Sequence, residues 1–163
     1  MLTVSEVVCV LQNGKGEKKG IVIFKENSKS MTIRVVIEGL TEGKHGFHIH
    51  KSGDLRYGCD SLCDHFNPMN QSHGSRTSSV RHMGDLGNVI ADGDGNVDET
   101  FRDSKLRIHG TYGILGRSVV VHTNEDDLGR GGNDESLKTG NAGKRVLCGV
   151  IGISKSMCSV KIN

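Results

Sequence analysis

Short runs of β-type residues, separated by turn signals, recur along this chain and limit its fold more than any other feature. No segment shows the 3.6-residue period of apolar side chains that marks an amphipathic helix. Asn13-Gly14, after the first run, is a strong hairpin signal. About eight or nine strands joined by turns indicate an all-β sandwich or barrel. The expected strands cover residues 4–11, 20–24, 31–37, 44–50, 88–90, 97–101, a run near 105–109, 118–122 and 145–153.

The composition fits one domain, residues 1–163, with long connections between its strands. A chain of 163 residues can bury a core without many crosslinks. With no tryptophan and only 4% aromatic residues, that core must consist of valine, isoleucine and leucine. Two polar, glycine-rich segments, about 51–85 and about 123–144, interrupt the succession of strands. Structureless segments of this length are usually functional, so we expect two functional loops.

Charge and hydropathy exclude several classes of function. The formal net charge is +2, and no basic block or basic stripe with aromatic residues indicates a nucleic acid partner. No stretch approaches the length of about 18 apolar residues that crosses a membrane. The first residues lack the basic and apolar regions of a signal peptide, so we expect a cytoplasmic protein. Five cysteines without a CxxC pair then predict free thiols by default.

Two histidines, His48 and His50, lie two residues apart in one expected strand. Side chains at this spacing point to the same face of a strand and could hold one ion together. The spacing alone is more typical of two surface histidines on an ordinary strand. Further metal-binding residues follow, however, and the complete set indicates a metal site. They are His65, His73, His82, Asp85 and His122.

The chemistry of these residues suggests two metals. Three histidines and a carboxylate (His65, His73, His82, Asp85) form a set suited to tetrahedral zinc. Imidazole nitrogens alone (His48, His50, His122, with a share in His65) suit copper. An imidazole can bind one metal through each ring nitrogen, so His65 could serve both sites. From the residues alone, this bridging stays a hypothesis.

Residues 92–98 resemble the start of an EF-hand calcium loop, with aspartate or asparagine at alternate positions. The sixth position is Val97, where such a loop needs glycine, and the twelfth is Asp103 in place of glutamate. No helices are expected on either side. We therefore interpret the segment as a hairpin turn.

Seven longer motifs are spread along the chain. They are GFHIH at 46–50, HFNP at 65–68, GDLGN at 84–88, GRSVVVH at 116–122, DLGRGGN at 127–133, TGNAGKR at 139–145 and CGVIG at 148–152. With these motifs the chain resembles the copper/zinc superoxide dismutase family over essentially its full length. The resemblance implies an eight-stranded antiparallel Greek-key barrel with a disulfide and zinc loop at about 51–85 and an electrostatic loop at about 123–144.

The resemblance also implies an activity and two cofactors, one copper and one zinc per subunit. Superoxide would be converted to dioxygen and hydrogen peroxide by alternating reduction and reoxidation of a copper ion bridged to zinc through His65. Copper would lie on His48, His50, His65 and His122, and zinc on His65, His73, His82 and Asp85.

Further roles follow from the same resemblance. Arg145 and His65 would be catalytic, with Arg145 and Lys138, and less directly Arg130 and Lys144, guiding the anion by their charge. Asp126, which in the acidic run 125–127 would otherwise be read as a solvated residue, would connect a copper histidine to a zinc histidine. Cys59 and Cys148 would form a disulfide, which replaces the default of free thiols for this pair.

Family members usually form homodimers, and the matching apolar surface includes Leu115, Val150 and Ile153. In the family, prolines on either side of the residue that matches Arg145 are associated with strict dependence on a copper chaperone. Here these positions are Lys144 and Val146. A copper chaperone is therefore a possible partner, but we expect that it is not required. Cys63 and Asp64 depart from the family pattern before His65, and Ser52 replaces an aromatic residue of the dimer surface.

Two other classes of function stay open beside the enzyme. One is a non-catalytic binding module, such as the dismutase-like domain of a copper chaperone. The other is a zinc-only structural barrel that never receives copper. His45 and His109 fall outside both ligand sets and are interpreted as structural or surface residues.

Overall fold

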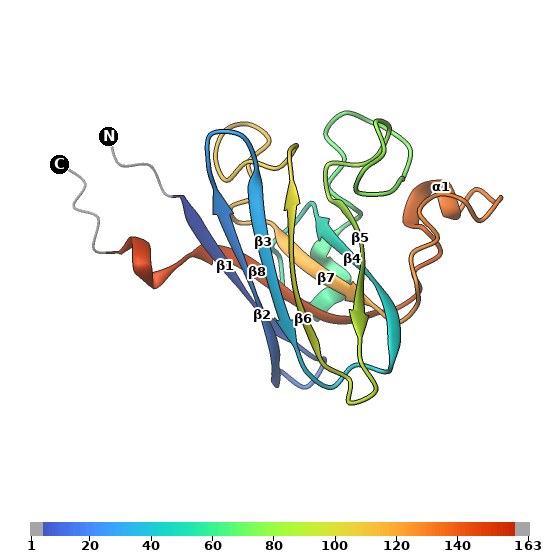
Figure 1. Cartoon of the computed structure of the whole chain (residues 1–163), viewed down its shortest axis with the longest axis horizontal. Coiled ribbons are helices and arrows are strands. Elements are labelled where there is room, and N and C mark those ends of the chain that lie inside the picture. Colours follow the sequence, from blue (N-terminus) through green and yellow to red (C-terminus); the bar gives the residue numbers. More distant parts are fainter. Residues whose placement is uncertain (1–4, 159–163) are drawn as a thin grey trace.

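Eight antiparallel strands form nearly all of the regular structure in this computed structural model, which describes residues 5–158. The strands are β1 Glu6–Gln12, β2 Lys18–Glu26, β3 Met31–Ile37, β4 Gly43–His50, β5 Asp85–Ala91, β6 Val97–Asp103, β7 Ser118–His122 and β8 Arg145–Ile153. One short helix, α1 Ser136–Thr139, and two 3-10 turns, η1 Gly58–Leu62 and η2 Lys155–Met157, complete the structure (Figure 1). No helix of the described residues is long and apolar enough to cross a membrane.

The strands form one sheet in the order β5-β4-β7-β8-β1-β2-β3-β6, which curls into a nearly closed barrel. Its two edge strands, β5 and β6, are neighbours in sequence, and Glu99 of β6 accepts a hydrogen bond from the Ile90 N–H of β5 at 2.8 Å. The connections β3–β4 and β6–β7 each pass over two strands, which makes the topology a Greek key. The expected all-β fold is confirmed.

Three predicted strands, 31–37, 118–122 and 145–153, agree with the structure, and five others differ from it by a few residues at their ends. Val4, the first residue of the expected strand 4–11, lies outside the described residues. The strand expected near 105–109 is wrong. Asp103 Oδ1 accepts the N–H groups of Lys105 and Leu106, and these bonds turn the chain out of the sheet.

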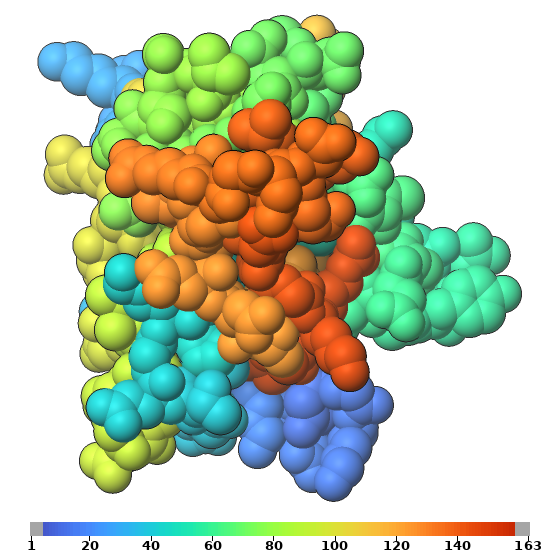
Figure 2. All heavy atoms as spheres, turned by 90° about the vertical axis from the view of Figure 1, so that its right-hand side faces the viewer, coloured from blue at the N-terminus to red at the C-terminus, as the bar shows by residue number. Residues whose placement is uncertain are grey.

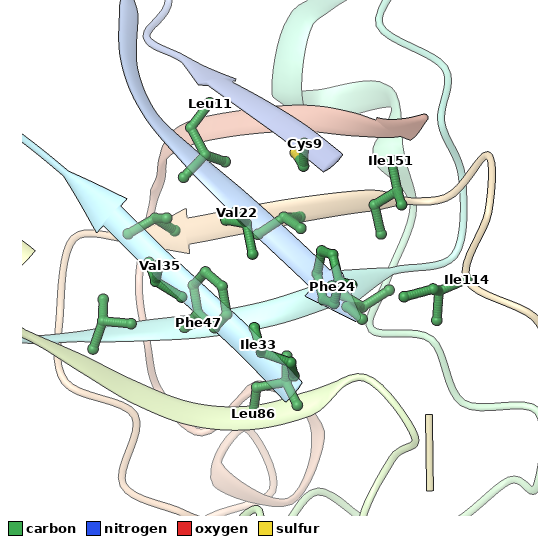
Figure 3. Packing of buried hydrophobic residues seen from close by; sticks show 14 of the residues in the cluster. Cys9, Leu11, Val22, Phe24, Ile33, Val35, Phe47, Leu86, Ile114 and Ile151 are labelled. Carbon is green, nitrogen blue, oxygen red and sulfur yellow. The ribbon is translucent and has the colours of Figure 1, made fainter. Parts of the chain in front are cut away.

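The core fills the barrel with aliphatic side chains and very few aromatic ones (Figure 3). Strands β2 and β3 alternate buried and exposed residues, as expected for a sheet with one face toward the core. Phe47 and Phe101 pack edge to face with ring centroids 6.2 Å apart. Leu106 and Ile108, which lie in no strand, are also fully buried. Each fully buried side chain of this size contributes about 1.5–3 kcal/mol.

The segment at residues 92–96 is a turn, as expected, and joins β5 to β6, but these two strands are the edges of the sheet and are not paired as a hairpin. Asp92 Oδ1 accepts the N–H groups of Asp94 and Asn96 at 3.0 and 2.8 Å. Gly95 has φ +80°, and a Cβ there would collide with the carbonyl oxygen of Leu40. The side chain of Asp92 therefore stabilises the turn.

Two long loops lie together on one side of the barrel and form much of the face in Figure 2. The first connects β4 to β5 and contains η1, and the second connects β7 to β8 and contains α1. The orange second loop spreads over the middle of this face, with green parts of the first loop directly above it. They are tied together where the His73 N–H donates to the Leu137 carbonyl at 2.8 Å.

Candidate metal centre

Four buried histidines meet where the end of β4, the end of β7 and the first loop come together. His48 and His50 lie on β4, and His122 ends the neighbouring strand β7. His65 of the first loop pairs with His50 through an isolated β-bridge. One ring nitrogen from each of the four lies within 4.8 Å of the others, and all four residues are buried.

A second buried cluster shares His65 and adds His73, His82 and Asp85. Asp85 Oδ1 lies 2.9, 3.0 and 3.1 Å from the Nδ1 atoms of His65, His73 and His82. The Nδ1 atoms of His65 and His82 are 3.3 Å apart. In a tetrahedral zinc site with bonds of about 2.0 Å, ligand atoms are about 3.3 Å apart. The residues therefore have the spacing that zinc requires.

Five ring nitrogens in the two clusters are buried and have no hydrogen-bond partner among the described residues. Buried polar atoms almost always have a partner, because leaving one unpaired costs about 1–3 kcal/mol. The atoms are His48 Nδ1, His50 Nε2, His65 Nε2, His73 Nδ1 and His122 Nε2. His65 directs Nδ1 to the carboxylate cluster and keeps Nε2 for the imidazole cluster. A metal bound to each cluster would satisfy these atoms, so the residues fit both copper and zinc.

Asp126 connects the two clusters. Its carboxylate accepts hydrogen bonds from His48 Nε2 at 2.7 Å and from His73 Nε2 at 2.8 Å. These bonds fix the tautomer of both rings and leave each Nδ1 available to a metal. Gly140 makes the approach possible, because a Cβ there would collide with Asp126 Oδ1. Its backbone also has φ +69°, which favours glycine.

Backbone carbonyls orient His50 and His122, two other histidines of the four-histidine cluster. His50 Nδ1 donates to the Cys63 carbonyl at 2.8 Å, and His122 Nδ1 donates to the Gly143 carbonyl at 3.0 Å. In both rings the remaining nitrogen, Nε2, is the unpaired one. His45 is also buried but lies outside the clusters, with its ring nitrogens near the carbonyls of His122 and Thr41.

Burial keeps the imidazole cluster neutral. It lowers the pKa of His48 and His50 well below 6.5, lowers that of His65, and lowers that of His122 to about 4. Neutral imidazole is the form that binds a metal. Burial alone would raise the pKa of Asp85, but its contacts with the surrounding imidazoles, that with His65 first, hold it far below the usual range. The carboxylate therefore stays charged.

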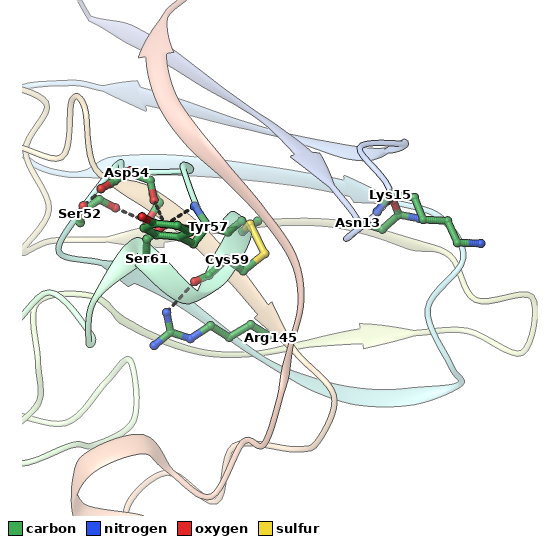
Figure 4. Close-up of a disulfide and its surroundings, with 11 residues drawn as sticks. Asn13, Lys15, Ser52, Asp54, Tyr57, Cys59, Ser61 and Arg145 are labelled. Atoms are coloured by element: carbon green, nitrogen blue, oxygen red, sulfur yellow. Dashed lines mark hydrogen bonds between the residues drawn. A yellow bond between two sulfur atoms is a disulfide. The ribbon is translucent and has the colours of Figure 1, made fainter.

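Arg145 begins β8 opposite His122 and is fixed by the first loop (Figure 4). Its Nη1 donates to the Cys59 carbonyl at 2.8 Å and its Nη2 to the Cys63 carbonyl at 2.7 Å. No motif in the sequence indicates these two backbone acceptors. Cys63 has φ +62°, which is unusual for a residue with a side chain. The guanidinium is thus held in one orientation beside the histidines.

A disulfide joins Cys59 and Cys148 across 89 residues, while Cys9, Cys63 and Cys158 are free. The default expectation of free thiols is wrong for this pair, and the disulfide implied by the resemblance is confirmed. The bond connects η1 in the first loop to β8, close to the carbonyls that hold Arg145.

A cleft of about 1340 Å³ opens over the histidines of the two clusters. His50, His65, His122 and Arg145 line it, and Lys138 of α1 lies in its wall. Arg130 and Lys144, the less direct candidates for guidance, are exposed and do not line it. Positive side chains in such a cleft attract anions from solution.

The fold and the two clusters define a Greek-key barrel with a dinuclear metal centre, and comparisons with known proteins agree. Residues 18–151 match the family described as copper/zinc superoxide dismutase. The chain is 50% identical over 155 residues to superoxide dismutase [Cu-Zn] of Paramecium bursaria Chlorella virus 1, covering 94% of this chain and 83% of that one. It is 53% identical over 148 residues to superoxide dismutase [Cu-Zn] A of Xenopus laevis, covering 90% and 97%. An extracellular superoxide dismutase [Cu-Zn] of Brugia pahangi is 47% identical over 150 residues, covering 90% and 75%.

The chain belongs to the copper/zinc superoxide dismutase family, and membership of this family implies copper and zinc as cofactors.

Proposed function

We propose that this protein is a superoxide dismutase that catalyses 2 O₂⁻ + 2 H⁺ → O₂ + H₂O₂. The observation that carries the proposal is the set of five buried, unpaired ring nitrogens in two clusters that share His65. These atoms support the ligand assignment. His48, His50, His65 and His122 would hold copper, and His65, His73, His82 and Asp85 would hold zinc.

Copper, when bound, would supply the one-electron redox chemistry of the reaction. The side chains prepare the site for that chemistry. Arg145 holds the anion in a fixed orientation, since the carbonyls of Cys59 and Cys63 restrain its guanidinium. His65 Nε2 would be a copper ligand, and when it is not bound to copper it is the buried atom at which this chain can hold one of the two protons that the reaction consumes.

Lys138 and Arg145 act before the reaction by attracting the anion into the cleft. Both line it, and both are cationic side chains. Focusing by such charges raises association rates by about 10 to 10³, and added salt weakens the effect.

The test is the rate of superoxide consumption by protein of known copper and zinc content. We expect fast activity in the wild type, a collapse in His122→Ala and little change in His109→Ala, a histidine outside both clusters. We also expect Arg145→Ala to lower the rate and reduce its dependence on ionic strength. An inactive wild type that contains full copper and zinc would refute the proposal.

A non-catalytic metal-binding module and a zinc-only barrel are the alternatives. Both predict no dismutation, and the zinc-only barrel also predicts no copper in protein isolated from its native source. The complete set of imidazoles around His65 Nε2, together with Arg145, favours the enzyme over both.

We propose that the chain acts as a single domain, residues 1–163, in a homodimer. Support comes from apolar side chains on two neighbouring segments, since Leu115, Val150 and Ile153 are 37%, 36% and 51% exposed. A second copy would cover them. Analytical ultracentrifugation should give twice the chain mass of 17.6 kDa, and Val150→Asp should shift it toward one chain.

We also propose that the enzyme works in the cytoplasm and obtains copper without a chaperone. The exposed free thiols of Cys63 and Cys158 suit a reducing compartment. Cell fractionation tests the location. The alternative location is outside the cell, since the names of two relatives describe extracellular enzymes. Absence of active enzyme in chaperone-deficient cells supplied with copper would refute the proposal that copper is obtained without a chaperone.

A further inference from the structure

The cleft over the metal centre is much larger than its substrate and continues away from Arg145. A diatomic anion takes up a volume on the order of one water molecule, about 30 Å³, while the cleft measures about 1340 Å³. One part of its wall consists of Arg145, Lys138 and the second loop. The rest includes Lys51 and the segment before β7, namely Thr111, Tyr112 and Arg117. We call these four residues the outer site.

Arg117 is held in place at the outer site by three contacts. Its guanidinium carbon lies 3.8 Å from the centre of the Phe66 ring. Its Nε donates to the Gly113 carbonyl at 2.8 Å, and its Nη1 donates to the Lys51 carbonyl at 2.9 Å. Nη2 has no hydrogen-bond partner among the described residues. A cation fixed in this way binds an anion at a low entropic cost, because its side chain is already ordered.

The other residues of the outer site add donors without a partner. Within the part of the chain that the structure describes, no hydrogen bond or ion pair involves Lys51 Nζ, Thr111 Oγ1 or Tyr112 Oη. All three side chains are exposed along the cleft. Lys51 and Arg117 each carry a positive charge, and Asp64, whose carbonyl accepts the Lys51 N–H at 3.0 Å, brings one negative charge. The local balance is positive.

We propose that the outer site is a second anion site, separate from Arg145, that binds a tetrahedral oxyanion such as inorganic phosphate or the phosphate group of an ester. Two cationic groups and two hydroxyls offer donors to four oxygens, whereas a carboxylate has only two. The ring of Tyr112, which is 42% exposed, also gives this wall an aromatic surface that the organic part of an ester can contact. The proposal does not depend on dismutation, since it rests on residues outside both metal clusters.

The test uses the protein loaded with zinc and copper(I), which is diamagnetic, and follows backbone amide signals while phosphate is added at constant ionic strength. We expect the amides of Thr111 and Tyr112 to shift in a saturable manner. Arg145→Gln should leave this titration in place. Lys51→Gln should weaken it about tenfold, while Lys138→Gln, which neutralises the other lysine of the cleft, should change it little.

Asp64→Asn gives a change in the opposite direction. Removal of its negative charge should tighten phosphate binding severalfold, and a merely structural perturbation would not do so. Phenyl phosphate then distinguishes the two sources of the ligand, because tighter binding than inorganic phosphate indicates an ester and equal binding indicates the free anion.

Two results would overturn the proposal. The first is the absence of a saturable shift at Thr111 and Tyr112 with phosphate in large excess. The second is a shift that Arg145→Gln abolishes and Lys51→Gln leaves unchanged, because phosphate would then bind only beside Arg145.

Discussion

At the scale of single residues, the metal centre depends as much on atoms that hold the ligands as on the ligands themselves. Asp126, the Cys63 carbonyl and the Gly143 carbonyl each accept a hydrogen bond from a cluster histidine. Each bond fixes which ring nitrogen carries the proton and which one remains for a metal. These hydrogen bonds around the clusters therefore determine which ring nitrogens are left to bind a metal in each cluster.

Asp126→Asn should weaken the binding of both metals, because one amide is a poor replacement for a carboxylate that accepts two N–H groups. We expect a loss of about 10- to 100-fold in affinity, measured by competition with a chelator of known affinity. Glu125→Gln is the matched control, since Glu125 is exposed and, among residues 5–158, pairs only with Lys44. Equal affinities in the two variants would contradict the role of Asp126.

The free cysteines should differ strongly in reactivity. Burial raises the pKa of the Cys9 thiol to about 12, so at pH 8 only about one molecule in 10⁴ carries the reactive thiolate. Cys63 is exposed. Iodoacetamide at pH 8 should therefore modify Cys63 and leave Cys9 intact in the folded protein, as read by peptide mass spectrometry. Rapid modification of Cys9 without unfolding would show that the barrel opens locally.

At the scale of structural elements, the second loop must approach the first loop closely for the centre to form. Gly140 ends α1 with φ +69° and leaves room for the carboxylate of Asp126 and the ring of His73. Gly132, in the same loop, has a similar φ of +75° but no atom near the position of a Cβ. The two glycines thus share the same backbone requirement and differ in their surroundings.

Gly140→Ala and Gly132→Ala should have similar costs from backbone strain, about 1 kcal/mol each. Only Gly140→Ala should also displace Asp126 from His73 and weaken zinc binding. Unfolding in denaturant and zinc competition measure the two effects separately. If both variants bind zinc like the wild type, the close approach at Gly140 is not needed for the site.

At the scale of the whole molecule, the barrel and the loops are joined by the bond between Cys59 and Cys148. It closes 89 residues, for which the chain-entropy model gives about 4–5 kcal/mol of stabilisation. The same segment provides the carbonyl that holds Arg145 Nη1. The crosslink therefore connects the stability of the barrel to the geometry of the cleft.

Replacing both bonded cysteines with serine should lower the free energy of unfolding by about 2–5 kcal/mol and lower the activity through a less ordered Arg145. Denaturant unfolding and superoxide consumption are the measurements. Cys158→Ser, which removes an exposed free thiol, is the control. A double variant with wild-type activity would show that the bond does not position Arg145.

The sequence predicts the strands and the ligand types well for physical reasons that apply locally. Alternating side chains identify β3, and His48 and His50 share a face because they lie two residues apart in β4. The buried pair Leu106 and Ile108 gives the same alternating pattern, yet it packs into the core without joining the sheet. The periodicity indicates which residues are buried, while the hydrogen bonds that Asp103 accepts from the N–H groups of Lys105 and Leu106 determine the local backbone conformation.

Other parts of the site depend on contacts between distant segments and leave no local pattern. The carbonyls that hold Arg145 come from residues 86 and 82 positions away. Asp126 lies 78 positions from His48 and looks like a solvated residue in the sequence. Its expected role came from the resemblance, and its distances to His48 and His73 now provide a physical reason for it.

The most direct test of the two-cluster centre is X-ray diffraction from crystals of the copper- and zinc-loaded protein, recorded on both sides of each metal's absorption edge. We predict a copper signal among His48, His50 and His122, and a zinc signal among His73, His82 and Asp85, with His65 between them. A single signal, a mixture of metals at both positions, or copper in the carboxylate cluster would contradict the account.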